Sequence, residues 1–321
     1  MTTHAKAPAD TVESRNKVKL ERDLGPEILT ALHDPKTVEI MLNADGKVWR
    51  ERLGGHKEVI VTIPASRGDA IIKTIAGLHQ KEATRNTPLI ECELPLDGSR
   101  FAGQLPPVVS APTFAIRKKA LAIFSLDQYV EADILTQQQL DTIRKAVRDH
   151  RNILVIGGTG SGKTTLVNAI INAMVVHDPS ERLIIIEDTG EIQCAAADFV
   201  QYHTTVDISM TTLLKTTLRM RPDRIIVGEV RGPEALDLIM AWNTGHEGGA
   251  ATIHANSALG GLSRMSTMIS MHPYAPSQIE SLIAESVHIL IFINKTPDGR
   301  RIREIVEVTG YENGKYLTNT L

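Results

Sequence analysis

The sequence has no long hydrophobic run and almost no cysteine, and each absence excludes a class of protein. No stretch approaches the ~18 apolar residues that a membrane-spanning helix needs. Residues 1–24 are polar and of mixed charge, with no apolar segment that could serve as a signal peptide. The two cysteines, Cys92 and Cys194, are far apart, which excludes a disulfide framework and a zinc site and fits a reducing compartment. We therefore expect a cytosolic protein that could still dock peripherally on a membrane complex.

An excess of basic charge is also missing. The chain has 35 Lys and Arg against 38 Asp and Glu, a formal net charge of -3, and only 4% aromatic residues. Motors that pull directly on nucleic acid commonly use basic channels and aromatic stacking platforms. We therefore expect no direct nucleic-acid binding, although a motor acting on DNA and a nucleotide-gated scaffold without turnover remain alternatives.

Turn signals and apolar periodicity divide the 321 residues, which are enough for two domains. In the first half, Asp45-Gly46 and Asp97-Gly98 each separate two apolar runs, which is a strong hairpin signal. Residues 67–79 between them carry apolar side chains at helical spacing. We expect a flexible or partly helical arm (1–24), an α+β domain (25–124), a linker (125–135) and an α/β domain (136–321).

The second domain alternates between apolar strands and helices. Strands are predicted at 153–156, 183–186, 199–203, 224–227 and 250–254, and helices at 136–150, 163–175, 210–220, 233–242 and 258–269. An antiparallel hairpin is predicted from 289–293 and 302–308. Continuous apolar strands separated by helices predict a mostly parallel sheet with helices on both faces.

A glycine-rich turn joins the strand at 153–156 to the following helix. It consists of Gly157, Gly158, Thr159, Gly160, Ser161, Gly162, Lys163 and Thr164 and satisfies the pattern G-x-x-x-x-G-K-[ST] in its proper strand–helix context. The glycines let backbone N–H groups surround phosphate oxygens, and the helix N-terminus adds a positive dipole. We expect Lys163 to reach the β- and γ-phosphates and the Thr164 hydroxyl to hold Mg²⁺, with Thr165 part of the same site.

Two acidic sites follow predicted strands, where a doubly wound sheet opens onto its ligand. Glu187 begins the run Glu187-Asp188-Thr189-Gly190-Glu191, and Glu229 follows the strand at 224–227. A carboxylate in such a place can orient water or complete the Mg²⁺ shell. Gly228 stands where many phosphate-loop enzymes place a Mg²⁺-binding Asp, so either Glu187 takes that role or Glu229 serves both purposes.

Histidines and arginines supply further candidates. His246 and His254 could sense the γ-phosphate, although a single His in a loop is more often a capping or core residue. Arg219, Arg221 and Arg231 flank the strand that leads to Glu229, and a guanidinium suits the charge that develops on a transferring phosphoryl group. Singly, each arginine is more often a surface ion-pair partner.

Taken together, these motifs resemble the secretion and traffic ATPases of type II and type IV secretion systems and type IV pili. The matching segments are the phosphate loop, the acidic box at 186–191, the stretch 218–231 and the histidine box at 244–254, with 97–101, 105–108 and 114–118 in the first domain. The chain is most similar to the type IV secretion and conjugation branch. It lacks a tetracysteine zinc module, and Gly232 stands where retraction ATPases tend to carry Asp.

The resemblance implies a RecA-like phosphate-loop domain in a homohexameric ring that hydrolyses ATP with Mg²⁺. Such a ring would power conjugal DNA or protein transfer, or pilus assembly, with inner-membrane secretion machinery as its partner at the cytoplasmic face. The resemblance assigns Glu187 to the acidic box, Glu229 to catalysis, and His246 and His254 to the histidine box. It also implies finger or sensor roles for Arg219 and Arg231 and an approach of Arg100 and Arg117 to the nucleotide, with the arginine that acts in trans left open.

Overall fold

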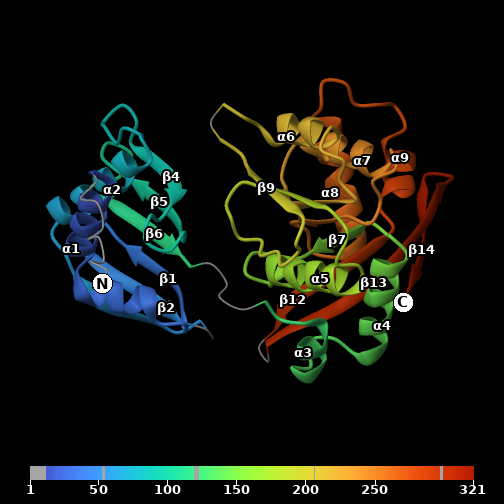
Figure 1. The fold of residues 1–321 in the computed structure, drawn as a ribbon, viewed down its shortest axis with the longest axis horizontal. Coiled ribbons are helices and arrows are strands. Elements are labelled where there is room, and N and C mark those ends of the chain that lie inside the picture. Colours follow the sequence, from blue (N-terminus) through green and yellow to red (C-terminus); the bar gives the residue numbers. More distant parts are fainter. Residues whose placement is uncertain (1–11, 53–54, 119–122, 206, 297–298) are drawn as a thin grey trace, which may run out of the picture. The chain divides into compact units, whose positions relative to one another are not determined.

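The structure is a computed structural model that describes residues 12–52, 55–118, 123–205, 207–296 and 299–321. The chain divides into two compact units, Met1–Leu121 and Ala122–Leu321 (Figure 1). Among the described residues, no helix is both long and apolar enough to cross a membrane.

The first unit is an antiparallel sheet covered by two helices. Its elements are α1 Val12–His33, β1 Thr37–Leu42, β2 Lys47–Arg52, β3 Lys57–Thr62, α2 Ala65–Leu78, β4 Leu89–Glu93, β5 Arg100–Gln104 and β6 Thr113–Arg117, and the strand order is β3-β2-β1-β6-β5-β4. The two predicted hairpins are β1–β2 and β4–β5, and α2 is the predicted helix. Buried residues of α1 and α2, such as Leu24, Ile28 and Ile72, join Ile40 and Phe101 of the sheet in one core.

The segment expected to be a flexible or partly helical arm, residues 1–24, is helical where the structure describes it, but it packs into the first unit instead of forming an arm. It is helical from Val12, and Leu20 and Leu24 are fully buried in the core of the first unit. The helix is kinked at Gly25, whose φ of 70° lies outside the helical region, and Pro26 follows. Residues 1–11 lie outside the described residues.

The second unit is built on an 8-stranded sheet in the order β14-β13-β12-β7-β11-β10-β8-β9. Its strands are β7 Ile153–Ile156, β8 Leu183–Glu187, β9 Phe199–His203, β10 Arg224–Val230, β11 Ala250–Ile253, β12 Ile289–Thr296, β13 Gly299–Glu312 and β14 Lys315–Thr320. The strands from β12 to β9 in this order are parallel, whereas β13 and β14 are antiparallel additions at one edge. The prediction of a mostly parallel sheet with a terminal hairpin is therefore confirmed.

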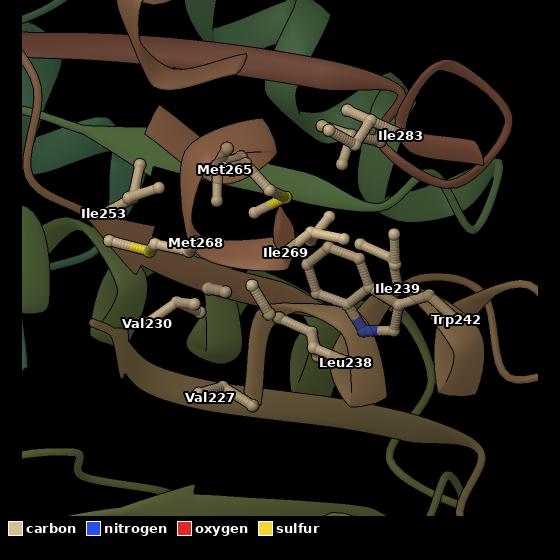
Figure 2. Packing of buried hydrophobic residues seen from close by; sticks show 14 of the residues in the cluster. Val227, Val230, Leu238, Ile239, Trp242, Ile253, Met265, Met268, Ile269 and Ile283 are labelled. Carbon is tan, nitrogen blue, oxygen red and sulfur yellow. The ribbon is translucent and has the colours of Figure 1, made fainter. Parts of the chain in front are cut away.

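Helices cover both faces of this sheet. They are α3 Leu126–Glu131, α4 Gln137–Arg148, α5 Lys163–His177, α6 Met210–Thr217, α7 Glu234–Trp242, α8 Ala258–Ser270 and α9 Ile279–Ser286. Along β7, Ile153 and Val155 pack with α3, α4 and α5, whereas Leu154 and Ile156 pack with α6 to α9. Figure 2 shows part of the core on the face covered by α6 to α9, in which Trp242 of α7 and Met265 of α8 lie among the apolar residues around β10 and β11.

The segment expected to be a linker, residues 125–135, instead begins the second unit. Ser125 caps α3 through a reciprocal capping box with Gln128, which satisfies helix N–H groups that would otherwise lack partners. Leu126, Tyr129 and Leu135 are buried in the core beneath α4 and α5. Strands β3, β6 and β14 and helix α9 also form where no element was predicted.

Candidate active site

The phosphate loop occupies the turn between β7 and α5 that its sequence predicts. Gly160 (φ 71°) and Gly162 (φ 98°) take left-handed conformations that favour glycine, and Gly162 is the N-cap of α5. The Lys163 ammonium donates to the carbonyl oxygens of Gly157 at 3.0 Å and Gly158 at 3.1 Å. The side chain therefore folds over the mouth of the loop, where the phosphates of a nucleotide would lie.

The carboxyl ends of the parallel strands bring Glu229 and His254 next to this lysine. His254, just after β11, lies with Nε2 2.8 Å from Glu229 Oε1, and Arg231 Nη2 donates to Glu229 Oε2 at 2.6 Å. The Lys163 ammonium lies 3.2 Å from His254 Nε2 and 3.4 Å from Nδ1. If Nε2–H donates to Glu229, Nδ1 is the nitrogen of the neutral ring that can accept from the ammonium. Burial, and then the charge of Lys163, lower the pKa of His254 below its ordinary value, which favours this neutral form.

Arg231 extends the cluster to the next strand. Its Nη1 donates to Asp188 Oδ2 at 2.8 Å, so one guanidinium joins Asp188, which follows β8, to Glu229 near the end of β10. The Thr204 hydroxyl donates to the other Asp188 oxygen at 2.9 Å. A cavity of about 370 Å³ opens beside this pair, and its lining includes Asp188, Arg231 and Glu234.

Glu187 is close to this cluster but has a different environment. It is 2% exposed, and its Oε2 accepts from the backbone N–H groups of Glu191 at 2.8 Å and Ile192 at 3.0 Å. Its Oε1 accepts from the side-chain amide of Gln201. Burial outweighs these hydrogen bonds and raises the pKa of Glu187 to about 7. Because both oxygens are engaged, Glu187 holds the 187–192 loop in shape, and the expectation that it binds Mg²⁺ does not fit its contacts.

The loop that Glu187 holds places another acid, Glu191, against the phosphate loop. The Thr164 hydroxyl is 3.4 Å from Glu191 Oε2, and Asn168 of α5 donates to the Glu191 carbonyl at 3.4 Å. Hydroxyl and carboxylate oxygens are the ligands that Mg²⁺ prefers. No cluster of three or more His, Cys, Asp or Glu side chains in metal-binding geometry occurs in the part of the chain that the structure describes, so a cation here would need phosphate or water oxygens to complete its shell.

His246 and Arg219 lie at the amino ends of the strands, in the loops that precede β11 and β10. Gly248 and Gly249, in the loop that carries His246, donate to the side-chain oxygen of Asn152, which immediately precedes β7. β11 separates this loop from His254 by about 10 Å of strand rise. Arg219 is exposed in the α6–β10 connection, at the start of β10 rather than its end. Neither side chain meets Glu229 within this chain's second unit, in contrast to the expectation for His246.

Arg100 and Arg117 belong to the first unit, and strand pairing brings them together. They face each other directly across β5 and β6, with Glu93 and Glu39 in the flanking cross-strand positions. Like charges directly opposite each other destabilise a sheet. Each arginine also lies opposite a glutamate, so the repulsion between Arg100 and Arg117 is offset within the sheet.

The sequence interpretation named Asp188 and Glu191 as members of the acidic run but gave neither a role. A signal for both was available, because a loop that follows a buried parallel strand next to the phosphate loop points several residues toward it. The expected strand at 250–254 likewise implied that His246 and His254 lie at opposite ends.

The fold and these contacts define a phosphate-loop ATPase, with a glycine-rich phosphate loop after β7 and acids at the ends of the neighbouring strands. The family model described as "Type II/IV secretion system protein" matches residues 83–296. The chain belongs to this family of secretion ATPases.

Individual relatives support the conjugation branch. The chain is 45% identical to conjugal transfer protein TrbB of Rhizobium radiobacter over 94% of its own length and 92% of that protein. It is 30% identical to the type IV secretion system protein PtlH of Bordetella pertussis, over 84% and 89% of the two chains.

Solved structures share the fold. The VirB11 ATPase of the Brucella suis type IV secretion system, in complex with sulphate, aligns with a TM-score of 0.50 and 25% identity, over 91% of this chain and 95% of that one. The pilus retraction motor PilT with bound ADP aligns with a TM-score of 0.63 at 20% identity, over 92% and 81% of the two chains, which supports the fold alone. The predicted architecture, a smaller N-terminal domain followed by a RecA-like ATPase domain, is confirmed.

Proposed function

We propose that the protein is a homohexameric ATPase that powers conjugal transfer of DNA or protein, or assembly of the pilus, from the cytoplasmic face of the inner membrane. The observation that carries the proposal is the contact chain Lys163–His254–Glu229–Arg231. It connects the phosphate loop to a carboxylate that can act on water. A protein that only bound nucleotide would not need that carboxylate.

Within this site, each side chain has a role that its contacts support. Lys163 binds the β- and γ-phosphates once they replace the carbonyl oxygens of Gly157 and Gly158 as its partners. Glu229 orients water and accepts its proton, because each of its oxygens contacts one partner, His254 or Arg231, and keeps a second lone pair for water. His254 reports on the terminal phosphate, since it touches both Lys163 and Glu229.

The residues around Thr164 fit Mg²⁺. The Thr164 hydroxyl and the Glu191 carboxylate would hold it, with Glu187 acting on the backbone behind them. Bound there, Mg²⁺ supplies positive charge against the phosphate oxygens. In this proposal Glu191 takes the Mg²⁺ role that Gly228 leaves open, and Glu229 acts on water.

Oligomerisation would complete the site. Arg100 and Arg117 lie opposite each other on neighbouring strands of the first unit, and Arg219 is exposed in the second. We propose that these arginines contact the nucleotide bound to their own subunit or to a neighbouring subunit of the ring. Inner-membrane secretion proteins dock on the assembled hexamer. Motion of the units driven by ATP would then become work on the transferred substrate.

The test compares purified wild type, Lys163→Ala, Glu229→Gln and the control Glu312→Gln, an exposed acid far along β13. Phosphate release, binding of a fluorescent ATP analogue and elution volume with and without Mg²⁺-ATP are measured. Lys163→Ala should abolish turnover by losing nucleotide, whereas Glu229→Gln should bind ATP and not cleave it. Near wild-type turnover in Glu229→Gln would refute the catalytic assignment. Strong stimulation by DNA with tight, salt-sensitive DNA binding would favour a nucleic-acid motor instead.

A further inference from the structure

The β12–β13 hairpin continues past the edge of the sheet at the phosphate loop. β12 pairs in parallel with β7 up to Phe292, which lies opposite Ile156, the last residue of β7. The phosphate loop begins at Gly157, directly after the end of β7, whereas β12 runs on to Thr296. The last residues of β12 and the first residues of β13 therefore extend beyond the point where the phosphate loop begins.

Arg300, at the start of β13, makes the contact with the loop. Its Nε and Nη2 each donate to the Gly160 carbonyl oxygen at 3.4 Å. A Cβ on Gly162 would lie only 2.9 Å from Arg300 Cδ and 3.2 Å from Nε. The guanidinium thus covers the outer side of the turn that leads into α5. Its hydrogen bonds to the Gly160 carbonyl are long, so a phosphate oxygen could replace that carbonyl as the acceptor.

A second cation lies beside Arg300. Lys295 is its direct cross-strand partner in the β12–β13 ladder, and directly opposed residues point to the same face. No ion pair joins either side chain to a carboxylate among residues 12–52, 55–118, 123–205, 207–296 and 299–321. Two like charges in this position destabilise the hairpin unless an anion lies next to them.

The start of β13 is held firmly enough to position Arg300. The Ile302 N–H donates to the Ile134 carbonyl at 2.8 Å, and Arg301 donates to the Asp133 carbonyl on the opposite side of the strand. Side chains alternate along a strand, so anchoring Arg301 to the α3–α4 connection fixes Arg300 on the face of the phosphate loop.

We propose that Arg300, assisted by Lys295, binds the part of the nucleotide that remains after hydrolysis, the diphosphate of ADP. This inference rests on the proposed function and deepens it. β7 lies between β12 on one side and β11 on the other, so Arg300 and the Glu229–His254 pair flank the phosphate loop from opposite sides. The terminal phosphate belongs with Glu229, and Arg300 therefore interacts with ATP and ADP alike. Such uniform binding changes KM and leaves kcat nearly constant.

The experiment measures dissociation constants of fluorescent ADP and ATP analogues, together with kcat and KM, on the full-length protein. The variants are Arg300→Ala, Arg300→Lys and Arg303→Ala, a matched control that removes an exposed arginine of the same strand. Arg300→Ala should weaken ADP and ATP by the same factor, about 10- to 100-fold, which is the usual effect of losing a charged hydrogen-bond donor. Its kcat at saturation should stay within about threefold of wild type. Arg300→Lys should recover most of the affinity, and Arg303→Ala should match wild type.

The outcomes separate this inference from the proposed function. If wild type binds neither nucleotide, the proposed function fails. If wild type binds both and Arg300→Ala binds ADP unchanged, this inference is overturned while the ATPase assignment stands. A loss confined to ATP, or a drop in kcat with ADP affinity intact, would place Arg300 on the terminal phosphate and also overturn it. Thermal unfolding without nucleotide should show no loss of stability in Arg300→Ala, because the side chain is exposed and its removal relieves the repulsion from Lys295.

Discussion

Gly228→Ala is expected to damage both the fold and the active site, because Gly228 lies against Glu187. A Cβ on Gly228 would be 2.9 Å from Glu187 Cβ, whereas carbon atoms in ordinary contact are about 3.5–4.0 Å apart. The two strands would have to separate by roughly 0.6–1.1 Å to restore that distance. Gly228 does not have a positive φ, so the whole effect comes from this contact.

The magnitude follows from packing. Adding a methyl group to a filled core costs about 1–3 kcal/mol, which for a unit of this size lowers the melting temperature by roughly 2–12 °C. Glu229 directly follows Gly228, and a displacement of about 1 Å at a catalytic group can reduce turnover about 100-fold. An Asp at this position would be worse, since it adds a carboxylate beside Glu187.

The assay combines thermal unfolding with steady-state phosphate release. Gly310→Ala is the matched control, because that strand glycine would gain only an ordinary contact of 3.7 Å with Leu317. The control should be neutral or slightly stabilised by reduced entropy of its unfolded chain. The double variant Glu187→Gly with Gly228→Ala, which removes the opposing Cβ, should be more stable than the sum of the single effects. Equal melting temperatures and equal turnover for Gly228→Ala and Gly310→Ala would refute the reasoning.

Three further predictions concern the same unit. The folded pKa of Glu187, about 7, lies above its ordinary value of 4.5, so its stabilising contribution is complete below pH 4.5 and is lost as pH rises through 7. The free energy of unfolding should therefore fall by up to about 3 kcal/mol as pH rises over that window. Glu187→Gln should remove this pH dependence, and a variant with the same pH dependence as wild type would contradict the prediction. His254→Gln should reduce kcat by about 100-fold or more. His246→Gln should leave the ATP dissociation constant of the isolated subunit unchanged in an equilibrium binding measurement. An equal loss of ATP affinity in the two variants would contradict the placement of these histidines at opposite ends of β11. Arg224→Met should lower the free energy of unfolding by about 3–5 kcal/mol in chemical denaturation, because the buried Glu181 carboxylate loses its ion pair with the fully buried Arg224 guanidinium. Adding Glu181→Gln to the same chain should recover part of that loss.

The sequence predicted the elements that local signals specify. β7 and β9 begin and end at the predicted residues, because each is a run of strand-forming side chains. The phosphate loop was also correctly placed, since its glycines and its position between strand and helix are local features. By contrast, α1 was underestimated because its N-terminal half is polar on most positions, and its packing depends on burying Leu20 and Leu24 in the first unit.

Charge alone did not identify the role of each acid. Glu187 and Glu191 are equivalent as letters in the acidic run, but only the folded loop shows that Glu187 accepts backbone N–H groups while Glu191 faces Thr164. The contact between Gly228 and Glu187 is equally invisible in the sequence, because it joins two parallel strands that are far apart in the chain.

The sequence by itself determined the alternation of strands and helices, the phosphate loop and the family, because each depends on residues that are neighbours in the chain. The tertiary structure alone decided which carboxylate meets which partner, that His254 contacts both Lys163 and Glu229, and that Arg300 lies against Gly160. The physical reason is that a hydrogen bond depends on distances of a few ångströms between side chains, and those distances are set only when the strands take their order in the sheet.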